Sequence, residues 1–535
     1  MAYLFSPYSM SFLLGVICAA ALPPLNSLPL TLVALIGFFW LYMQKKPKRT
    51  GLYSYLFAFG YFLLGLYWIG NALLVEGNAY RWAWPLAVIG LPLGLSLFYG
   101  LAGWFTGHFF KNTPQAFKAL FLCHAFVTAE WIRSYVFTGF PWNLMGTAWS
   151  DYLILMQSAS IIGLLGLTWL MLLIAYLVAL ACYTNTKKTR LIAGFSAISL
   201  IAVNAIFGLY ALKTNDTNPD NDAPPVHVIT IQPNIPQHEK WDRLYLQQNI
   251  DKLIATTLDG IAEQPVDNGS LLIIWPETAL SYQLIENKSF LTQLIQRFSA
   301  AANTNEITFI TGALTRHYDA KADKMRYQNA ALYINNQGEI FGQYSKTHLV
   351  PFGEYIPFQQ YIPLKTVTGF SGFTKGNGPE LQTINSHIKL MNKICYEIIF
   401  PSEFSVKGST NQSPNGIVHI TNDAWYGTSS GPYQHLNITR WRAIENNTHV
   451  FRAANKGVSA SITPNGYLKN QAYISKQSSS YIKFYSYKTN ASLYILVGIW
   501  LCPLLLALMN TILLIKGLKI TSKKSLLKNL QNLTF

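Results

Sequence analysis

Charged residues are scarce in this sequence. Only 12% of its 535 residues are Asp, Glu, Lys or Arg, whereas 51% are hydrophobic. Because soluble domains carry about 25% charged residues, much of the chain must lie in lipid. The net charge of +16 does not indicate nucleic acid binding, because many Lys and Arg residues stand in short segments beside apolar runs.

Cysteine is also rare, with five residues in the chain. Four of them lie in long apolar runs, where a thiol behaves as a small hydrophobe: Cys18, Cys123, Cys182 and Cys502. Such a set cannot form a disulfide framework. Cys395 differs, because it lies in a short strand-like run that ends at Pro401. Taken alone, this pattern fits a buried core thiol and a nucleophile equally well.

Several metal and cofactor motifs are missing. The chain contains no H-E-x-x-H or paired H-x₃-H spacing, no Walker loop and no Rossmann fingerprint. We therefore expect no metal and no cofactor, and we expect His348 to be a structural hydrogen-bonding residue. The N-terminus also lacks the basic segment of a cleavable signal peptide, so the first apolar run is expected to remain as a span.

Long apolar runs are abundant instead. A membrane-spanning helix needs about 20 apolar residues, and eight runs approach that length: 6–22, 26–43, 51–74, 84–107, 116–133, 155–182, 190–212 and 491–515. The segments between alternate runs are basic: 44–50, 108–118, 183–190 and 516–535. The positive-inside rule then places both termini in the cytoplasm. We expect seven transmembrane helices in residues 1–213, an eighth in 488–515, and a basic cytoplasmic tail in 516–535.

The loop after the fifth run is rich in aromatic residues. Residues 135–149 combine Trp, Tyr and Phe with Gly and Pro, and such amphipathic rings are typical of the headgroup level. Glu130 and Arg133 precede the loop. They form either a functional intramembrane pair or two residues that snorkel at a helix end.

A polar linker, 214–225, precedes a region of ordinary globular composition. Residues 226–487 alternate strand-like runs with helical segments at 241–263, 287–303 and 433–447, which predicts a single α/β domain. The predicted strands lie at 227–235, 270–277, 307–314, 329–335, 388–397, 416–423, 449–455 and 459–466.

Three polar residues stand at or beside predicted strands of this domain. Glu277 follows an apolar run in Trp275–Thr278, and Lys346 begins the stretch Lys346–Glu354. Taken alone, the pattern around Glu277 fits a solvated carboxylate at a strand end, and the pattern around Lys346 fits a surface lysine. Together with Cys395, at successive strand ends of one sheet, they form a chemical unit. The cation stabilises a thiolate and an oxyanion, and the carboxylate moves the proton.

The motifs W-P-E-T, K-T-H-L-V-P-F-G-E and I-C-Y-E, in this order, resemble those of the nitrilase superfamily. With eight spans and the stretches FTGFPWN, TNDAWYG and GPYQH, the chain is similar to its membrane-embedded branch, the apolipoprotein N-acyltransferase family of Gram-negative bacteria. The resemblance implies an α-β-β-α sandwich beside a membrane helical bundle. It also implies that Cys395 is the nucleophile, Glu277 the base and Lys346 the oxyanion-stabilising cation.

Further roles follow from the same resemblance. Glu354, Tyr396 and Glu397 correspond to supporting residues, and the Tyr396 backbone N–H would complete an oxyanion hole. Trp241 corresponds to a substrate-contacting tryptophan, and residues 358–376 have the character of a lid.

The resemblance implies a ping-pong reaction without a cofactor. A phospholipid donates an acyl chain to Cys395, and the α-amine of a diacylated apolipoprotein accepts it. The expected setting is the inner membrane, with the catalytic domain in the periplasm, and the expected state is a monomer. Three alternatives stay open: a membrane-tethered amidase that hydrolyses its thioester with water, a transporter with an external binding domain, and an inactive lipoprotein-binding scaffold.

Overall fold

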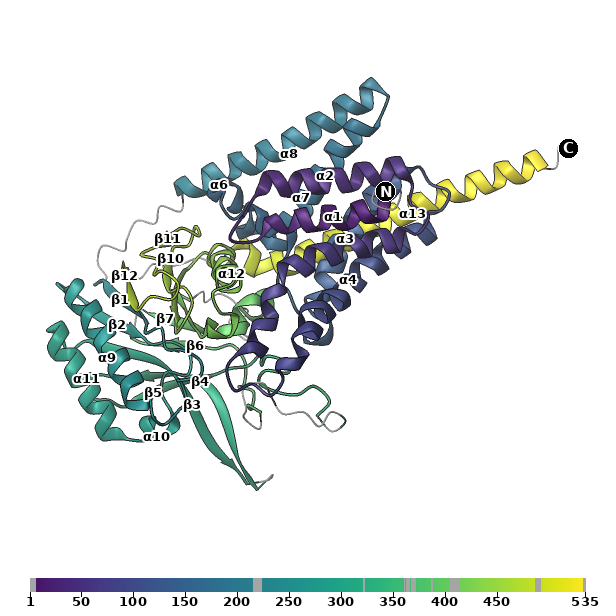
Figure 1. Cartoon of the computed structure of the whole chain (residues 1–535). Helices are drawn as coiled ribbons and strands as arrows, with labels where there is room; N and C mark the ends of the chain where they lie inside the picture. The colour runs from purple at the N-terminus through teal and green to yellow at the C-terminus, as the bar shows by residue number, and fades with distance from the viewer. Residues whose placement is uncertain are drawn as a thin grey trace. The chain divides into compact units, whose positions relative to one another are not determined.

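The computed structural model describes residues 6–214, 224–320, 323–359, 361, 366, 372–385, 388–404, 414–485 and 492–532. The predicted linker 214–225 and lid 358–376 lie mostly outside the described residues, so both stay predictions. The chain divides into two compact units (Figure 1). The helical unit comprises Met1–Ile69, Pro85–Lys213 and Leu496–Phe535, and the sandwich unit comprises Gly70–Trp84 and Thr214–Ile495.

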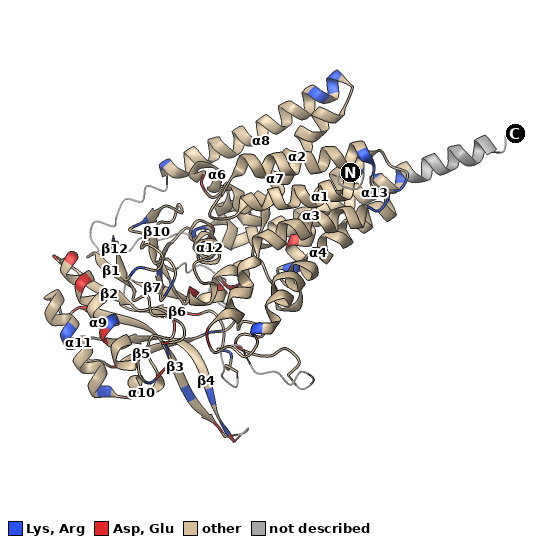
Figure 2. Ribbon diagram, in the orientation of Figure 1, with Lys and Arg blue, Asp and Glu red and all other residues tan. Residues whose placement is uncertain are grey.

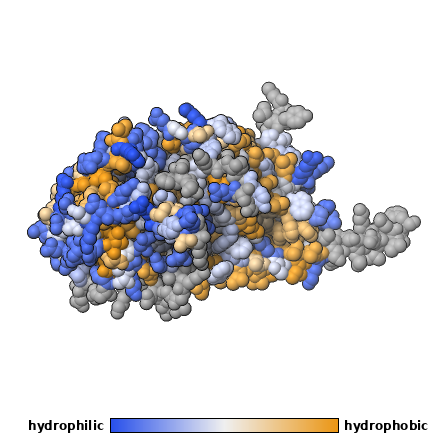
Figure 3. Space-filling view, turned by 90° about the horizontal axis from the view of Figure 1, so that it is seen from below, coloured by the Kyte–Doolittle hydropathy of each residue, from blue (hydrophilic) through white to orange (hydrophobic). Residues whose placement is uncertain are grey.

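The helical unit consists of apolar helices joined by short connections. Its elements are α1 (Pro7–Cys18), α2 (Leu28–Lys45), α3 (Thr50–Gly65), α4 (Trp84–Phe109), α5 (Gln115–Arg133), α6 (Leu153–Met156), α7 (Ala159–Tyr183), α8 (Lys187–Thr214) and α13 (Ile499–Asn532). Lys and Arg gather at helix ends, and few charges lie along the helices (Figure 2). Large apolar side chains are exposed, for example Phe195 at 73% and Ile198 at 67% on α8. Hydrophobic patches of this kind appear in orange in Figure 3, and they suit contact with lipid.

The described residues contain five helices long and apolar enough to cross a membrane, or six if α3 and the following turn Tyr67–Leu74 form one span with a 44° bend. α1 has only 12 residues, and α5 includes the buried polar residues Lys118, His124, Glu130 and Arg133. The chain is therefore a membrane protein by its helices, while the count of eight spans remains a prediction.

Glu130 and Arg133 form a buried ion pair on α5, with Nη2 of Arg133 2.7 Å from Oε2 of Glu130. The Arg133 guanidinium also donates to the carbonyl oxygens of Trp142 at 2.8 Å and Asn143 at 3.2 Å. Tyr99 donates its hydroxyl proton to Glu130. The snorkelling interpretation is therefore wrong, because both side chains are buried in the helical unit and hold the following loop by its backbone.

The same loop corrects a second expectation. Trp142 and Trp149 are each only 1% exposed, and the Trp149 indole donates to the carbonyl oxygen of Leu167 at 3.2 Å. These two rings are therefore packed inside the protein and are not exposed to lipid headgroups, while the depth of the loop stays a prediction. Phe137, at 88% exposure, and Tyr135, at 45%, are aromatic residues of this loop that are open to their surroundings.

The sandwich unit contains two six-stranded sheets. The first has the order β12-β1-β2-β3-β4-β5 and the second β11-β10-β9-β8-β7-β6. The strands are β1 (Val226–Gln232), β2 (Ser270–Ile274), β3 (Ile307–Asp319), β4 (Lys324–Ile334), β5 (Ile340–Ser345), β6 (Leu381–Thr383), β7 (Lys389–Ile394), β8 (Gly416–Thr421), β9 (His449–Ala454), β10 (Ala460–Ile462), β11 (Leu468–Lys469) and β12 (Ser478–Phe484).

The sheets face each other across an apolar core. Val228 and Ile274 of the first sheet pack with Val418 and Ile394 of the second. The outer face of the first sheet packs on α9 (Leu246–Glu263) and α11 (Lys288–Ala302), with the short helix α10 (Tyr282–Ile285) beside them. α12 (Gly431–Asn446) contacts β9 of the second sheet. The unit is thus the expected α-β-β-α sandwich (Figure 1).

All eight predicted strands and the three predicted helices are present, with shifted ends. Four strands escaped prediction: β5, β6, β11 and β12. β12 reads SSSYIKF, whose serines have little strand propensity, yet it pairs with β1 along its whole length.

Candidate functional site

The three polar residues singled out in the sequence follow three different strands. Glu277 comes three residues after β2, Lys346 directly after β5, and Cys395 directly after β7. β2 and β5 belong to the first sheet and β7 to the second. The expectation that all three lie on one sheet is therefore wrong: the site combines strand ends of two facing sheets.

The carboxylates and the lysine lie within contact of one another. Nζ of Lys346 is 2.8 Å from Oε1 of Glu354 and 3.6 Å from Oε1 of Glu277. Nδ2 of Asn329, on β4, donates to Oε1 of Glu277 at 2.7 Å. Lys346 is 1% exposed, Glu277 and Glu354 are 6%, and Cys395 is 8%. The interpretations of Lys346 as a surface lysine and of Glu277 as a solvated carboxylate are therefore wrong.

Burial and charge shift the protonation of this group in a consistent way. Burial alone lowers the pKa of Lys346, but the charges of Glu354 and Glu277 outweigh it and raise the pKa overall. Burial raises the pKa of the Cys395 thiol, and the negative charge of Glu277 adds to this shift while Lys346 opposes it. At neutral pH the site thus holds an ammonium and a protonated thiol. Attack by this sulfur requires a base that removes its proton.

Cys395 sits in an unusual backbone conformation. Its φ is +52°, in the left-handed region, and it begins the 3₁₀ turn η6 (Cys395–Ile399). A non-glycine residue in such a conformation carries about 1–3 kcal/mol of strain, which persists only where the surroundings impose it.

Glu397 ties this turn to the segment that carries Lys346. Its carboxylate accepts from the backbone N–H of Ile394 at 2.8 Å, of Thr347 at 2.5 Å and of His348 at 3.1 Å. The Tyr344 hydroxyl donates to it as well, at 3.0 Å. Burial raises the pKa of Glu397. One buried carboxyl group therefore joins the ends of β5 and β7.

His348 and Tyr396 pack beside this junction. Nδ1 of His348 is 2.6 Å from Oε1 of Glu403. The imidazole stacks on Phe400 with ring centroids 3.7 Å apart, and it meets the Tyr396 ring edge-on at 5.6 Å. His348 therefore has the structural role that the sequence predicted.

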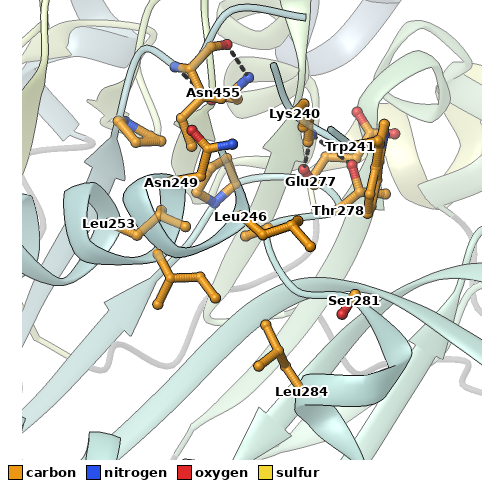
Figure 4. Close-up of a pocket in the computed structure, with 15 residues that line it drawn as sticks. Lys240, Trp241, Leu246, Asn249, Leu253, Glu277, Thr278, Ser281, Leu284 and Asn455 are labelled. Atoms are coloured by element: carbon orange, nitrogen blue, oxygen red, sulfur yellow. Dashed lines mark hydrogen bonds between the residues drawn. The ribbon is translucent and has the colours of Figure 1, made fainter. Parts of the chain in front are cut away.

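A pocket with about 440 Å³ of empty space, part of it open to solvent, lies between α9 and the turn after β2 (Figure 4). Trp241 lines it together with Lys240, Glu277 and Thr278, and Leu246, Asn249 and Leu253 of α9 line another side. Nζ of Lys240 donates to the carbonyl oxygen of Glu277 at 2.9 Å and to Oγ1 of Thr278 at 2.7 Å.

These contacts fix the turn that carries Glu277. Thr278 has a φ of +49°, and the Lys240 ammonium bonds both residues of the turn. Gly312 on β3 leaves room for it, since a Cβ there would lie 2.4 Å from the Pro276 carbonyl oxygen. Burial lowers the pKa of Lys240 to about 8.

A second pocket, of about 430 Å³, opens beside the carboxylates. Trp241, Glu277 and Thr278 line both pockets, and the second adds Gln237, Leu314, Asn329, Glu354, Phe373, Asn422 and Trp425. Trp241, predicted from the resemblance to contact substrate, thus lies beside the predicted base.

Two residues of this site escaped the sequence analysis. Asn329 stands in a strand-like run that indicated only core packing, and Lys240 adjoins Trp241 in a polar segment. Neither lies in a pattern that distinguishes a buried polar residue from an exposed one. Only their contacts show that they hold Glu277 from two sides.

The two-sheet sandwich with buried Glu, Lys and Cys at its strand ends, joined to apolar helices, defines a membrane-bound protein with a carbon-nitrogen hydrolase domain. Sequence comparison gives the same class, because the Carbon-nitrogen hydrolase family matches residues 228–479. The family described as Apolipoprotein N-acyltransferase N-terminal domain matches residues 14–177. The chain belongs to the apolipoprotein N-acyltransferase family.

Curated relatives cover most of the chain. The apolipoprotein N-acyltransferase of Allorhizobium ampelinum is 36% identical over 84% of this chain and 85% of its own length. That of Rickettsia bellii is 36% identical over 86% of this chain and 88% of its own. Among solved structures, a carbon-nitrogen hydrolase from Helicobacter pylori G27 matches with 18% identity and a TM-score of 0.33, over 48% of this chain and 88% of its own. The assignment rests on the sequence relatives.

Proposed function

We propose that this protein transfers an acyl chain from a phospholipid to the α-amine of the S-diacylglyceryl cysteine at the start of an apolipoprotein. The family membership supports lipoprotein N-acylation. The observation that carries the chemistry is the buried contact of Lys346 with two carboxylates, beside a thiol that needs a base.

In the first step Glu277 takes the proton from Sγ of Cys395 as the sulfur attacks the ester carbonyl of the phospholipid. The Lys346 ammonium and the Tyr396 backbone N–H stabilise the oxyanion of the tetrahedral intermediate. The intermediate collapses to a thioester on Cys395. The lysophospholipid leaves as an alcohol after Glu277 returns the proton.

In the second step the lipoprotein amine attacks the thioester carbonyl. Glu277 accepts a proton from the amine, the C–S bond breaks, and the amide product leaves with the acyl chain. The sulfur then recovers the proton from Glu277. Atoms and charge balance without a cofactor, because the phospholipid ester already supplies an activated acyl group.

Glu354 and Glu397 support this chemistry by holding the reacting residues in position. Glu354 holds Lys346 at 2.8 Å, and Glu397 holds the segments that carry Lys346 and Cys395 together. Trp241 lies where a substrate group beside Glu277 would contact it. We also propose that the enzyme acts as a monomer.

The setting follows from the substrates and the basic segments. Both substrates are anchored in lipid, which explains the apolar helices. The basic segments favour a sandwich unit outside the cytoplasm, so we propose a bacterial inner-membrane protein with its site on the periplasmic side.

Lysophospholipid release distinguishes a transferase from an amidase. Without an acceptor, the transferase should release about one lysophospholipid per Cys395 and then stop, because the thioester waits for an amine. Adding a synthetic diacylated lipopeptide should restart release. Continuous release without the lipopeptide would contradict the proposal and favour hydrolysis by water.

A further inference from the structure

The carbonyl oxygen of Cys395 faces two buried histidines. Nε2 of His419, on β8, and Nε2 of His435, on α12, each lie 3.2 Å from this oxygen. Both side chains are fully buried. The backbone of the predicted nucleophile is thus contacted from the neighbouring strand and from the covering helix.

A buried ion pair lies behind the two histidines. Nη2 of Arg452, on β9, is 2.5 Å from Oδ2 of Asp423. The other guanidinium nitrogen, Nη1, is 2.9 Å from Nδ1 of His419. Oδ1 of Asp423 is 2.8 Å from Nδ1 of His435 and accepts from the Thr421 hydroxyl at 3.0 Å. Asp423 therefore contacts His435, and Arg452 contacts His419 closely and His435 at a longer distance of 3.5 Å.

These contacts determine which nitrogen of His419 carries the proton. A guanidinium has only donors, so Nδ1 of His419 must accept from Arg452. The neutral ring then carries its proton on Nε2, which donates to the Cys395 carbonyl. His435 differs, because a donor at Nδ1 suits Asp423 and a donor at Nε2 suits the carbonyl. Burial lowers the pKa of His435 and favours the neutral ring, which donates to only one of these two acceptors at a time.

We propose that Asp423, Arg452 and His419 form a positioning relay for the nucleophile, with His435 as a second contact to the same carbonyl. Asp423 orients Arg452, Arg452 fixes the His419 ring, and His419 holds the Cys395 carbonyl by a hydrogen bond. This bond stabilises the left-handed backbone at φ +52° and so directs Sγ towards Glu277 and Lys346. The inference rests on the proposed role of Cys395 as nucleophile.

The backbone around Asp423 leaves little freedom for this relay. A Cβ on Gly457 would lie 2.6 Å from Oδ2 of Asp423, so a side chain there must displace the carboxylate that Arg452 binds. Gly457→Ala therefore disturbs the relay at its far end without changing any group that touches Cys395.

The decisive variants change His419. Glutamine offers an oxygen that accepts from Arg452 and an amide N–H₂ that donates to the carbonyl, so His419→Gln retains both contacts. His419→Leu removes both at similar volume. His449→Leu is the matched control, because His449 is a buried histidine of the adjacent strand β9 that instead stacks on Phe451 and meets Phe484 edge-on.

The test measures two rates in the full-length, detergent-solubilised protein. The first is acyl-adduct formation on Cys395 from phospholipid, followed by intact mass. The second is alkylation of Cys395 by iodoacetamide, followed by peptide mass, which requires no phospholipid. We expect His419→Leu to slow adduct formation by about a hundredfold, the scale of an ångström of misplacement, with the apparent KM for phospholipid unchanged.

His419→Gln should recover most of the adduct rate, Gly457→Ala should fall between the two, and His449→Leu should match the parent even if its melting temperature falls. Alkylation of Cys395 should change in His419→Leu and return in His419→Gln. Equal adduct rates in the parent and His419→Leu, or equal loss in His419→Gln and His419→Leu, would overturn the relay. If the parent itself forms no adduct, the proposed function fails. In that case alkylation alone tests the relay, and an equal alkylation rate in the parent and His419→Leu would overturn it.

Discussion

The ammonium of Lys346 lies 2.8 Å from Oε1 of Glu354, and both groups are almost completely buried. The other oxygen of Glu354 accepts from the backbone N–H of Val350 at 2.9 Å, so the carboxylate is itself held in place. Glu277 stands farther from the same ammonium, at 3.6 Å. Glu354 thus supplies much of the charge that raises the pKa of Lys346.

Glu354→Gln should reduce turnover by about ten- to a hundredfold while the protein still folds. Glutamine retains an oxygen for Lys346 but loses the negative charge that raises the pKa of the lysine. Lys346 should then draw closer to Glu277 and weaken it as a base. Single-turnover acylation of Cys395 measures the effect, and a rate equal to that of the parent would exclude this role for Glu354.

Lys346→Ala should lower turnover by at least about a hundredfold, the scale of removing one oxyanion donor. Lys346→Arg should not restore it, because a planar guanidinium differs in shape and hydrogen bonding from an ammonium. The exposed Lys324→Ala is a suitable control on β4. Turnover of Lys346→Ala within a few-fold of the parent would show that the ammonium does not act in the reaction.

Lys240 should make stability depend on alkaline pH. Its pKa is lowered from 10.5 to about 8 by burial, so between these values the unfolded chain binds a proton that the folded protein has released. Stability therefore rises with pH across this window. The difference in melting temperature between the parent and Lys240→Met should shift in favour of the parent from pH 8 to pH 10.5. A pH-independent difference would mean that Lys240 keeps an ordinary pKa.

Local patterns in the sequence predicted much of the fold and the main site residues. The apolar runs marked the helices, and alternation of short runs marked eight of the twelve strands of the described sandwich unit. The motif resemblance brought out Glu277, Lys346 and Cys395 although each has a common alternative explanation when taken alone. The sequence analysis failed on long-range arrangement. Cys395 belongs to the opposite sheet from Glu277 and Lys346, and this assignment depends on strand pairing, which no local pattern encodes.

Buried polar partners were equally hard to foresee. Glu130 and Arg133 looked like residues that snorkel at a helix end, yet both are buried: Arg133 donates to loop carbonyl oxygens, and Glu130 pairs with Arg133. His419 and Asp423 lie on and just after β8, Arg452 lies on β9, and the pairing of these two strands brings the three side chains together. A polar residue in an apolar strand has the same sequence pattern whether or not it has a buried partner.

The basic segments predict which face of the membrane each unit occupies. With the exposed Cys182 replaced by Ser, a cysteine at Tyr473, which is 75% exposed in the sandwich unit, should react with a membrane-impermeant thiol reagent added to spheroplasts. A cysteine at the exposed Lys48, in the basic segment 44–50, should react only after the membrane is broken. The reverse pattern would place the sandwich unit in the cytoplasm.

The central claim is that Cys395 carries the acyl chain between two lipids, and intact mass spectrometry of the purified protein tests it most directly. Incubation with phospholipid should add one acyl group, located on the peptide that contains Cys395, and a diacylated lipopeptide should remove it as the amide product forms. Cys395→Ser should show no adduct and no transfer, because a hydroxyl is a far weaker nucleophile here, whereas Cys182→Ala should behave as the parent. Acylation of the lipopeptide by Cys395→Ser, or an adduct on any other residue, would contradict the account.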